Sequence, residues 1–240
     1  MNALSATLGL LALAGLVVAL VTYVVRLPAF AFREVVVATP LTRASGAQLE
    51  ATIRDDLAGT FFTMDLARSR VMLGRVPWVR DVALRRQWPN RLEITVEEHE
   101  PLARFNDGGF VNTRGEMFEA QARDELPRFL GPEARAREMA DRYRAWSEAL
   151  RPLALDVAEV HLSPRGGWRV RAVGSESALT LELGREDADA RLARFIAAYR
   201  QTIGALARSG TRVETVDLRY RNGYAVRVPA FREKNQKPAA

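Results

Sequence analysis

The chain of 240 residues contains no cysteine, which excludes disulfide bridges, thiolate metal sites and cysteine nucleophiles. Its two histidines, His99 and His161, are far apart in sequence and do not form a metal-binding pair. The motifs GxSxG, SxxK and GxxxxGK[ST] are also absent. We therefore expect no catalytic residue, no metal and no cofactor. The composition favours a binding module over an enzyme.

The densest group of ionisable side chains is EEHEP, residues 97–101, in which three carboxylates surround His99. Such a group could be taken for an acid–base catalyst. Consecutive residues at the end of a strand point to opposite faces, however, so these side chains are not expected to converge. We interpret the segment as a solvated joint between two domains.

Lysine is nearly absent, since the chain has only Lys234 and Lys237 and its other basic residues are all arginine. The formal net charge is +6, but no run of basic residues is longer than two. Arginine alternates with acidic residues in segments such as RDDLAG. This pattern predicts a solvated surface of mixed charge and argues against nucleic-acid binding.

The first 25 residues carry no charged side chain, and Leu4–Val25 is almost wholly apolar. As a helix, these residues span about 33 Å, enough to cross a hydrocarbon core of about 30 Å. The alternative is a signal peptide cleaved after Ala29-Phe30-Ala31, which would release a secreted cell-wall enzyme starting at Phe32. The apolar run is longer than a signal peptide needs, and no basic residue precedes it. We therefore favour a retained transmembrane helix over residues 4–27.

Charge does not settle the orientation of this span. Arg26 and Arg33 follow it and nothing basic precedes it, which argues weakly against export of the C-terminal part. Long domains translocate largely regardless of flanking charge, so the rule has little force here.

The segment from residue 32 to 98 predicts a small α+β module. A Val-rich strand (32–39) precedes a helix (45–59) with Ser45 and Gln48 at capping-box spacing and a buried stripe of Leu49, Ile53 and Leu57. A second helix covers 66–73, and two alternating strands then flank a turn at Pro89-Asn90. The predicted order is β-α-α-β-β.

Two tryptophans, Trp78 and Trp88, bracket the first strand of that hairpin. Our preferred interpretation is that both anchor the sheet to the helices. The alternative is that the Arg-rich outer face of the strand, through Arg85 or Arg86, docks a partner.

The second half predicts a sheet with two long helices. The helices are expected over Glu133–Leu150 and Asp187–Ala207, and a tail at 229–240 is expected to be disordered. Expected strands cover 102–105, 109–118, 127–130, 155–162, 168–173, 178–183, 212–220 and 224–228. The last two strands form a hairpin whose Asn222-Gly223 pair is the strongest signal for a two-residue turn.

The returning strand of this hairpin comes so late that little chain follows to cover its edge. Exposed strand edges are normally protected, so this one is expected to pair with a partner. Tyr224, Val226 and Val228 share one face of the returning strand and Ala225 and Arg227 share the other, and one of these faces is expected to cover the two long helices. Tyr220 suits a partner contact and core packing equally well.

Three segments carry a family resemblance: VPWVRDVALRRQWPNRLEITVEEHEPLARFND (76–107), LGREDADARLARF (183–195) and VDLRYRNGYAV (216–226). They resemble the bacterial cell-division family FtsQ, called DivIB in Gram-positive bacteria. The resemblance implies an α+β chain with residues 1–3 in the cytoplasm and a single transmembrane helix. A POTRA domain (32–99) and a β-domain of antiparallel sheet with two long helices (100–228) would follow.

The resemblance further implies a non-catalytic scaffold of the divisome. It would lie in the cell inner membrane at the septum, with its N-terminus in the cytoplasm and its bulk in the periplasm. It would bind FtsB and FtsL and connect FtsK, FtsW, FtsI and FtsN to septal peptidoglycan synthesis. The alternative is a POTRA-containing component of secretion or outer-membrane assembly.

The site residues are also implied by the resemblance, in which FtsB adds along the edge of the last strand by β-augmentation. The implied contact residues are Leu218, Arg219, Tyr220, Gly223, Tyr224, Ala225, Val226, Arg165 and Trp168. A weaker, second recruitment surface on the POTRA domain would consist of Val79, Arg80, Arg85 and Arg86.

Overall fold

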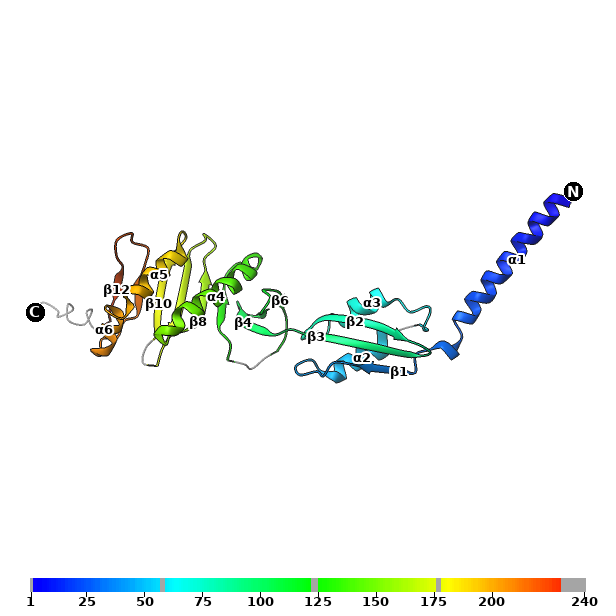
Figure 1. Ribbon diagram of the computed structural model, residues 1–240, viewed down its shortest axis with the longest axis horizontal. Coiled ribbons are helices and arrows are strands. Elements are labelled where there is room, and N and C mark those ends of the chain that lie inside the picture. Colours follow the sequence, from blue (N-terminus) through cyan, green and yellow to red (C-terminus); the bar gives the residue numbers. More distant parts are fainter. Residues whose placement is uncertain (1, 57–58, 122–124, 176–177, 230–240) are drawn as a thin grey trace, which may run out of the picture. The chain divides into compact units, whose positions relative to one another are not determined.

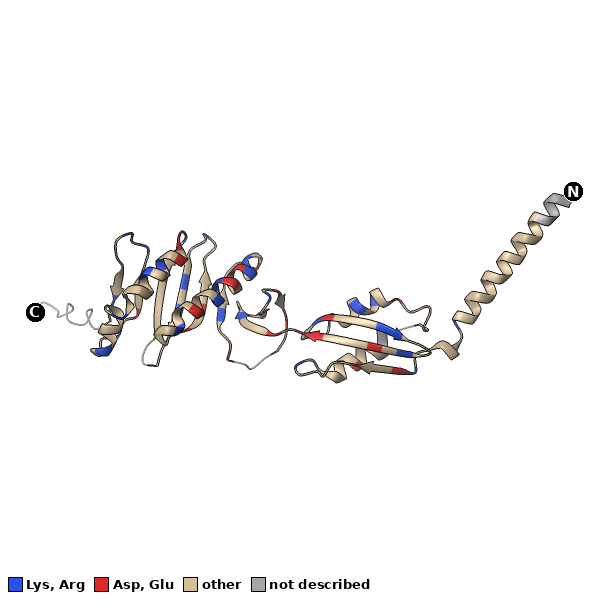
Figure 2. Ribbon diagram, viewed as in Figure 1, with Lys and Arg blue, Asp and Glu red and all other residues tan. Residues whose placement is uncertain are grey.

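The computed structural model describes residues 2–56, 59–121, 125–175 and 178–229. The chain divides into two compact units, Met1–His99 and Glu100–Ala240 (Figure 1). Charged residues of both signs are interspersed over the elements of both units (Figure 2), in keeping with a mixed-charge surface. The expected disordered tail falls almost entirely outside the described residues.

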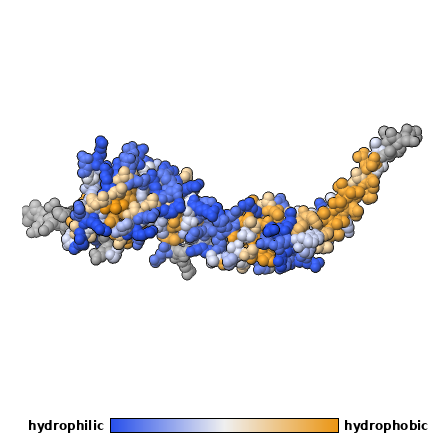
Figure 3. Space-filling view, in the orientation of Figure 1, coloured by the Kyte–Doolittle hydropathy of each residue, from blue (hydrophilic) through white to orange (hydrophobic). Residues whose placement is uncertain are grey.

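The first unit begins with helix α1 (Asn2–Val25), which has no charged residue and is largely hydrophobic on the face seen in Figure 3. Within it, Thr7–Val25 has a mean hydropathy of 2.6 and none of it is buried. A helix without a polar face is either buried in a protein core or spans a membrane, and since this one is not buried, it fits a single membrane span. A short 3-10 helix, η1 (Pro28–Phe30), follows it.

The rest of the first unit has two helices and a three-stranded sheet. Its elements are β1 (Glu34–Val37), α2 (Gly46–Asp56), α3 (Leu66–Leu73), β2 (Val79–Gln87) and β3 (Arg91–Glu98). The strand order is β1-β3-β2, in which β1 runs parallel to β3 and β2 antiparallel to it. The predicted order β-α-α-β-β is confirmed.

Both helices of this unit start at the residues that the sequence indicates. The hydroxyl of Ser45 accepts a hydrogen bond of 3.3 Å from the N–H of Gln48, and the Asp65 carboxylate accepts bonds from the first turn of α3. Leu49 is buried as expected, whereas Leu57 lies outside the described residues.

The predicted hairpin of β2 and β3 is present, with its alternating apolar residues on one face. Val82 faces Val96 and Leu84 faces Ile94 across the ladder. Trp78 is buried at the start of β2, with the Arg43 guanidinium 5.1 Å from its ring. Trp88 is 67% exposed, so the prediction that both tryptophans anchor the sheet is wrong for Trp88. It follows the last residue of β2 and lies in the turn before β3.

The second unit is built on a sheet that has nine strands among the described residues. The order is β12-β11-β10-β9-β8-β7-β4-β5-β6. The strands are β4 (Pro101–Phe105), β5 (Gly109–Asn112), β6 (Met117–Phe118), β7 (Arg128–Leu130), β8 (Asp156–Leu162), β9 (Trp168–Val173), β10 (Ala178–Gly184), β11 (Thr215–Asp217) and β12 (Ala225–Arg227). The helical segments are η2 (Glu133–Arg135), α4 (Ala136–Leu150), η3 (Arg151–Leu153), α5 (Ala188–Tyr199) and α6 (Ile203–Arg208).

The chain is α+β as expected, but the second sheet is mixed and not wholly antiparallel. The pairs β4–β7, β7–β8 and β10–β11 are parallel. Helix α4 connects β7 to β8, and α5 with α6 connects β10 to β11. A helical crossover returns the chain to run in the same direction, which a tight hairpin cannot do.

The predicted helix Asp187–Ala207 is wrong as one helix, because it breaks between α5 and α6. At the break the N–H and the hydroxyl of Thr202 both bond to the Ala198 carbonyl. Ile203 is buried directly after the break. A Cβ on Gly204 would lie 3.1 Å from the Tyr199 carbonyl oxygen, so glycine permits this close turn.

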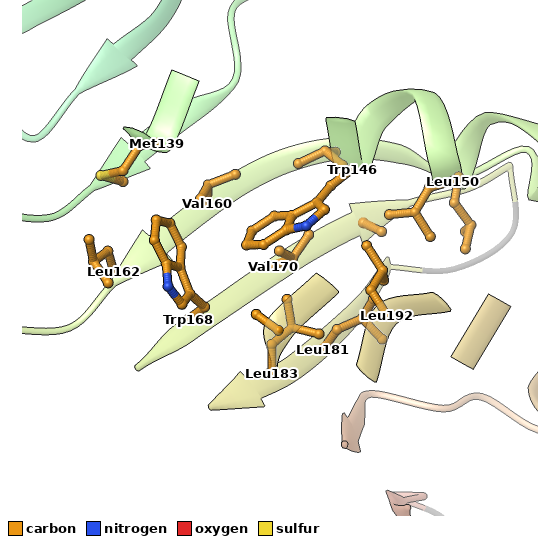
Figure 4. Close-up of a cluster of buried hydrophobic side chains, with 14 of the residues drawn as sticks. Met139, Trp146, Leu150, Val160, Leu162, Trp168, Val170, Leu181, Leu183 and Leu192 are labelled. Carbon is orange, nitrogen blue, oxygen red and sulfur yellow. The ribbon is translucent and has the colours of Figure 1, made fainter. Parts of the chain in front are cut away.

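Helices α4 and α5 pack on one face of the second sheet and cover its core (Figure 4). Strands β8, β9 and β10 alternate buried and more exposed residues, as expected for a sheet with one covered face. The rings of Trp146 on α4 and Trp168 on β9 meet edge to face, with centroids 5.4 Å apart. The core therefore lies between the two helices and the central strands.

The closing hairpin is present, but the predicted two-residue turn is wrong. Thr215 pairs with Arg227 and Asp217 with Ala225, so seven residues, 218–224, connect the strands. Leu218 donates its N–H to the Glu182 carbonyl and is buried. Tyr224 packs on Phe195 and bonds through its hydroxyl to Thr202. Burial of these two residues draws the chain away from a tight Asn-Gly turn.

Candidate partner-binding edge

Strand β12 forms one end of the nine-stranded sheet. It pairs with β11 on one side, and among the described residues no strand pairs with its other side. An edge of this kind presents backbone N–H and C=O groups that another chain can pair with. The strand has only three residues, which leaves little pairing within the chain to hold it.

The two faces of β12 differ in burial. Val226, together with Tyr224 and Val228, is partly buried and packs against the core of the unit. Ala225 and Arg227 are exposed on the opposite face. A strand added beside β12 would therefore extend an apolar face and a polar face at the same time.

A shallow groove, the edge groove, runs along the exposed face beside β12. Two ion pairs line it, between Arg169 and Glu182 at 2.6 Å and between Arg219 and Asp217 at 2.6 Å. The residues of the edge groove are Arg169, Glu182, Glu214, Thr215, Asp217, Arg219, Ala225, Val226, Arg227, Val228 and Pro229.

The Arg219 side chain is held in one position by Asp217. Its Nε and Nη2 atoms donate to the two carboxylate oxygens at 2.8 and 2.6 Å. This forked contact lowers the pKa of the Asp217 carboxyl and raises the pKa of Arg219, so both groups stay ionised. A Cβ on Gly184, which has a φ of +79°, would lie 3.1 Å from the Arg219 side chain. Glycine at 184 thus leaves room for Arg219.

A second groove, the turn groove, continues from the edge groove, because both include Arg169, Glu182 and Arg219. It reaches the turn between β8 and β9, where Arg165 is exposed. Its ionisable residues are Arg165, Arg169, Arg185, Arg191 and Arg219 with Glu182, Glu186 and His161. The excess of arginine suits a partner segment with acidic side chains.

The structure brings most of the implied contact residues to this edge, but not all of them with an accessible side chain. Tyr220 is 58% exposed, which places it outside the core. Gly223 and Ala225 are also exposed. Leu218 and Trp168 are both 3% exposed, because their side chains pack into the core, so they can only support the site from within.

The weaker surface on the first unit is less coherent. Val79 is buried and Arg80 is paired with Glu97 at 2.5 Å. Arg86 donates to the Met64 carbonyl on the helix side of the sheet, whereas Arg85 is exposed on the outer side. Successive strand residues alternate between faces, so the two neighbouring arginines cannot form one patch.

The carboxylates of EEHEP have separate structural partners. While Glu97 pairs with Arg80, Glu98 accepts hydrogen bonds from the backbone N–H groups of residues 42–44 and from the Thr42 hydroxyl. Burial raises the pKa of Glu98, but these hydrogen bonds outweigh it and the net pKa is lowered. The two side chains do not converge on one site.

Sequence reasoning missed Arg185, Arg191 and Arg227 as groove residues. Arg191 is held by a 2.7 Å bond from its Nη1 to the Leu183 carbonyl, and Arg185 lies beside it in the turn groove. Both belong to the segment LGREDADARLARF (183–195), which carried the family resemblance but gave no indication of a basic groove. Only the folded sheet brings this segment next to the turn at Arg165.

An apolar helix that fits a single membrane span, a β-α-α-β-β domain and a mixed-sheet domain together are the architecture of a single-pass membrane protein with two folded extramembrane domains. Two protein-family models match the chain. The family "POTRA domain, FtsQ-type" matches residues 30–99, and the family "Cell division protein FtsQ/DivIB, C-terminal" matches residues 103–219. The chain belongs to the FtsQ/DivIB family of bacterial cell-division proteins.

Curated relatives match over most of the chain. The "Cell division protein FtsQ" of Nitrosospira multiformis is 37% identical over 91% of this chain and 93% of its own length. The protein of the same name from Burkholderia pseudomallei is 36% identical over 88% and 84%. The Escherichia coli protein of that name is 34% identical over 70% and 62%.

Proposed function

We propose that the chain is a non-catalytic scaffold of the divisome that recruits FtsB and FtsL at the β12 edge. Membership of a cell-division family supports the role in division. The observation that carries the proposed binding mode is the open side of β12, a three-residue edge strand with an apolar and a polar face. Strand addition there provides affinity through the backbone and specificity through side chains on alternate faces.

The two grooves supply the specificity in this proposal. A strand lying beside Ala225–Arg227 would place its polar face next to the edge groove, within reach of Arg169 and Arg219. A continuation of the same segment would meet Arg165 in the turn groove. Exposed Tyr220 adds an aromatic contact of the type that dominates interface energies.

The cellular setting follows from the family resemblance. α1 anchors the chain in the inner membrane, with the N-terminus in the cytoplasm and the two folded units in the periplasm at the septum. There it links FtsK and other early proteins to FtsW, FtsI and FtsN. The POTRA domain supplies a second recruitment surface on β2, where Arg85 is the exposed basic residue.

Calorimetry tests the site directly. The full chain in detergent is titrated with the extramembrane part of an FtsB-type partner, and Ala225→Pro, Val226→Pro and Tyr220→Ala are compared with the unchanged chain. Successive residues direct their backbone groups to opposite sides of a strand, so one of the two prolines removes an outward N–H. That variant is expected to bind at least tenfold more weakly, about 1.4 kcal/mol.

Met117→Pro is the matched control, because β6 is the opposite edge of the same sheet. It carries the same backbone change and should bind normally. Undiminished binding by all three folded variants would place the partner elsewhere, and the β2 edge would be tested next.

A further inference from the structure

Five aromatic side chains gather at one end of the POTRA domain, and they are called the aromatic cluster below. Its members are Phe30, Phe32, Phe61, Phe62 and Trp88. Neighbouring ring centroids lie 5.2 to 6.4 Å apart. The cluster contains four of the ten phenylalanines of the chain, an unusual concentration for a small region.

The aromatic cluster is not part of the buried core. None of its five members is among the buried residues, and Trp88 and Phe62 are 67% and 47% exposed. The core of the domain is mainly aliphatic, with residues such as Leu49, Leu92 and Ile94, and none of the five rings belongs to it. Phe30, Phe32 and Phe61 are partly buried, and together with exposed Phe62 and Trp88 they form a contiguous apolar patch of the kind that marks a contact surface.

The cluster is joined to the end of the membrane-spanning helix. The Thr60 hydroxyl donates a 2.6 Å bond to the carbonyl of Val25, the last residue of α1. Phe61 donates its N–H to the Phe30 carbonyl at 2.8 Å. Phe30 follows Val25 by five residues, which span at most about 17 Å even when fully extended. The cluster is therefore within reach of the bilayer surface.

The charges around the helix end suit lipid headgroups. Arg26 and Arg33 are exposed, and no acidic residue precedes Glu34 in the sequence. Glu34 itself is paired with Arg91 at 2.7 Å. Arginine side chains at the end of a span reach the phosphate groups, and tryptophan favours the same depth because its ring is apolar and its N–H polar.

We propose that the aromatic cluster inserts into the interfacial region of the bilayer and holds the POTRA domain against the membrane surface. Phe62 and Trp88 enter the lipid, while Arg26 and Arg33 contact the phosphates. The continuity of the cluster with the span identifies its occupant as the bilayer. This contact restricts the swinging of the POTRA domain about the short connection of residues 26–33 and fixes its distance from the membrane.

The absence of cysteine allows a direct test. Phe62→Cys in the full chain is labelled with a polarity-sensitive fluorophore and reconstituted in phosphatidylcholine–phosphatidylglycerol vesicles, with or without bromine on the acyl chains. Bromine is present in both leaflets, so the direction of insertion does not matter. The label is expected to emit at shorter wavelength than in water and to lose roughly half or more of its intensity with brominated lipid.

Arg75→Cys is the control. Arg75 is exposed and precedes the first residue of β2, whereas Trp88, a member of the aromatic cluster, follows the last residue of that strand. The nine residues of β2 separate the two positions by about 30 Å. The fluorophore attached to Arg75→Cys should show water-like emission and no quenching by brominated lipid. Equal, unquenched emission at both positions would overturn the proposal, as would equal quenching at both.

Intrinsic fluorescence provides a second readout that needs no label. Trp78, Trp146 and Trp168 are buried, so quenching of tryptophan emission by brominated lipid should come from Trp88. Trp88→Phe is expected to abolish that quenching, and its persistence in this variant would contradict the proposal. Neither experiment contains a division partner, so the outcome is independent of whether β12 binds one.

Discussion

The two hairpins of the chain differ in how firmly they are held. In the POTRA domain β2 and β3 pair over nine and eight residues, and Leu92, Ile94 and Val96 are buried on one face. In the second unit β11 and β12 pair over three residues each, and the connection between them has seven. The first hairpin is part of a core, and the second is an edge attached to one.

This difference shows which signals determine a hairpin. Along β2 and β3 many alternating apolar residues agree on one register, so a slip by one residue would expose them all. The closing hairpin has too few such residues, and the burial of Leu218 and Tyr224 outweighs the local preference of Asn222-Gly223. A strand with so little pairing of its own suits the addition of a partner strand.

The largest expected effect is the loss of stability when an apolar side chain is truncated, which should differ between the two hairpins. Leu92→Ala removes a fully buried side chain from β3 and should lower the free energy of unfolding of the POTRA domain by about 2–5 kcal/mol. Val226→Ala removes two methyl groups from a partly buried position and should cost about 1 kcal/mol in the second unit. Urea unfolding of the full chain in detergent, followed by tryptophan emission, measures both.

Each variant is the control for the other, since Trp78 reports on the first unit and Trp146 and Trp168 on the second. Similar losses from the two substitutions would contradict the contrast between a core hairpin and an attached edge.

Glu98, at the end of β3, tests whether the first hairpin is also fixed by polar contacts. Its carboxylate accepts hydrogen bonds from residues 42–44, so Glu98→Gln should destabilise the POTRA domain by about 1.5–3 kcal/mol. Glu97→Gln is the control, because the Glu97 side chain is 46% exposed and its pair with Arg80 should contribute at most about 1 kcal/mol.

The pH dependence of Glu98 has a defined sign. Its pKa is lower in the folded chain than in the unfolded one, so its contribution is complete above about pH 5.5 and is lost as the pH falls through the lowered value. The unchanged chain and Glu98→Gln should therefore converge in stability in acid. A difference between them that stays constant down to pH 2 would contradict the assignment.

The same contrast explains what the sequence could predict. The POTRA elements follow from strict alternation and from a local helix cap at Ser45. The break between α5 and α6 was missed because Gly204 reveals its role only through its approach to Tyr199. The parallel pairings of β7 with β8 and of β10 with β11 depend on helical crossovers, whose destination a local pattern does not specify.

The residues assigned to the candidate site lie at or near β12, but not all of their side chains are accessible. The family resemblance implied Trp168 and Leu218 as contact residues because of their positions in the sequence, yet both side chains are buried in the core. Tyr220, which periodicity left open, is exposed because the loop of residues 218–224 carries it away from the sheet. Arg185 and Arg191 join the site only through the fold.

The smallest expected effect tests the turn itself. If Asn222-Gly223 formed a two-residue turn, Gly223 would need a positive φ, and Gly223→Ala would cost about 1 kcal/mol or more. In the structure Gly223 does not have a positive φ, and a Cβ added there would meet no atom within 4 Å. The substitution should leave the free energy of unfolding unchanged or raise it by up to about 1 kcal/mol, because alanine restricts the unfolded chain.

Gly184→Ala is the matched control: Gly184 has a φ of +79° and its Cβ would lie 2.5 Å from Arg191, so this variant should lose stability in the same urea titration. A loss of stability in Gly223→Ala comparable to that in Gly184→Ala would instead support a two-residue turn at Asn222-Gly223. The strands β11 and β12 would then be longer, and the closing hairpin would resemble the hairpin of β2 and β3.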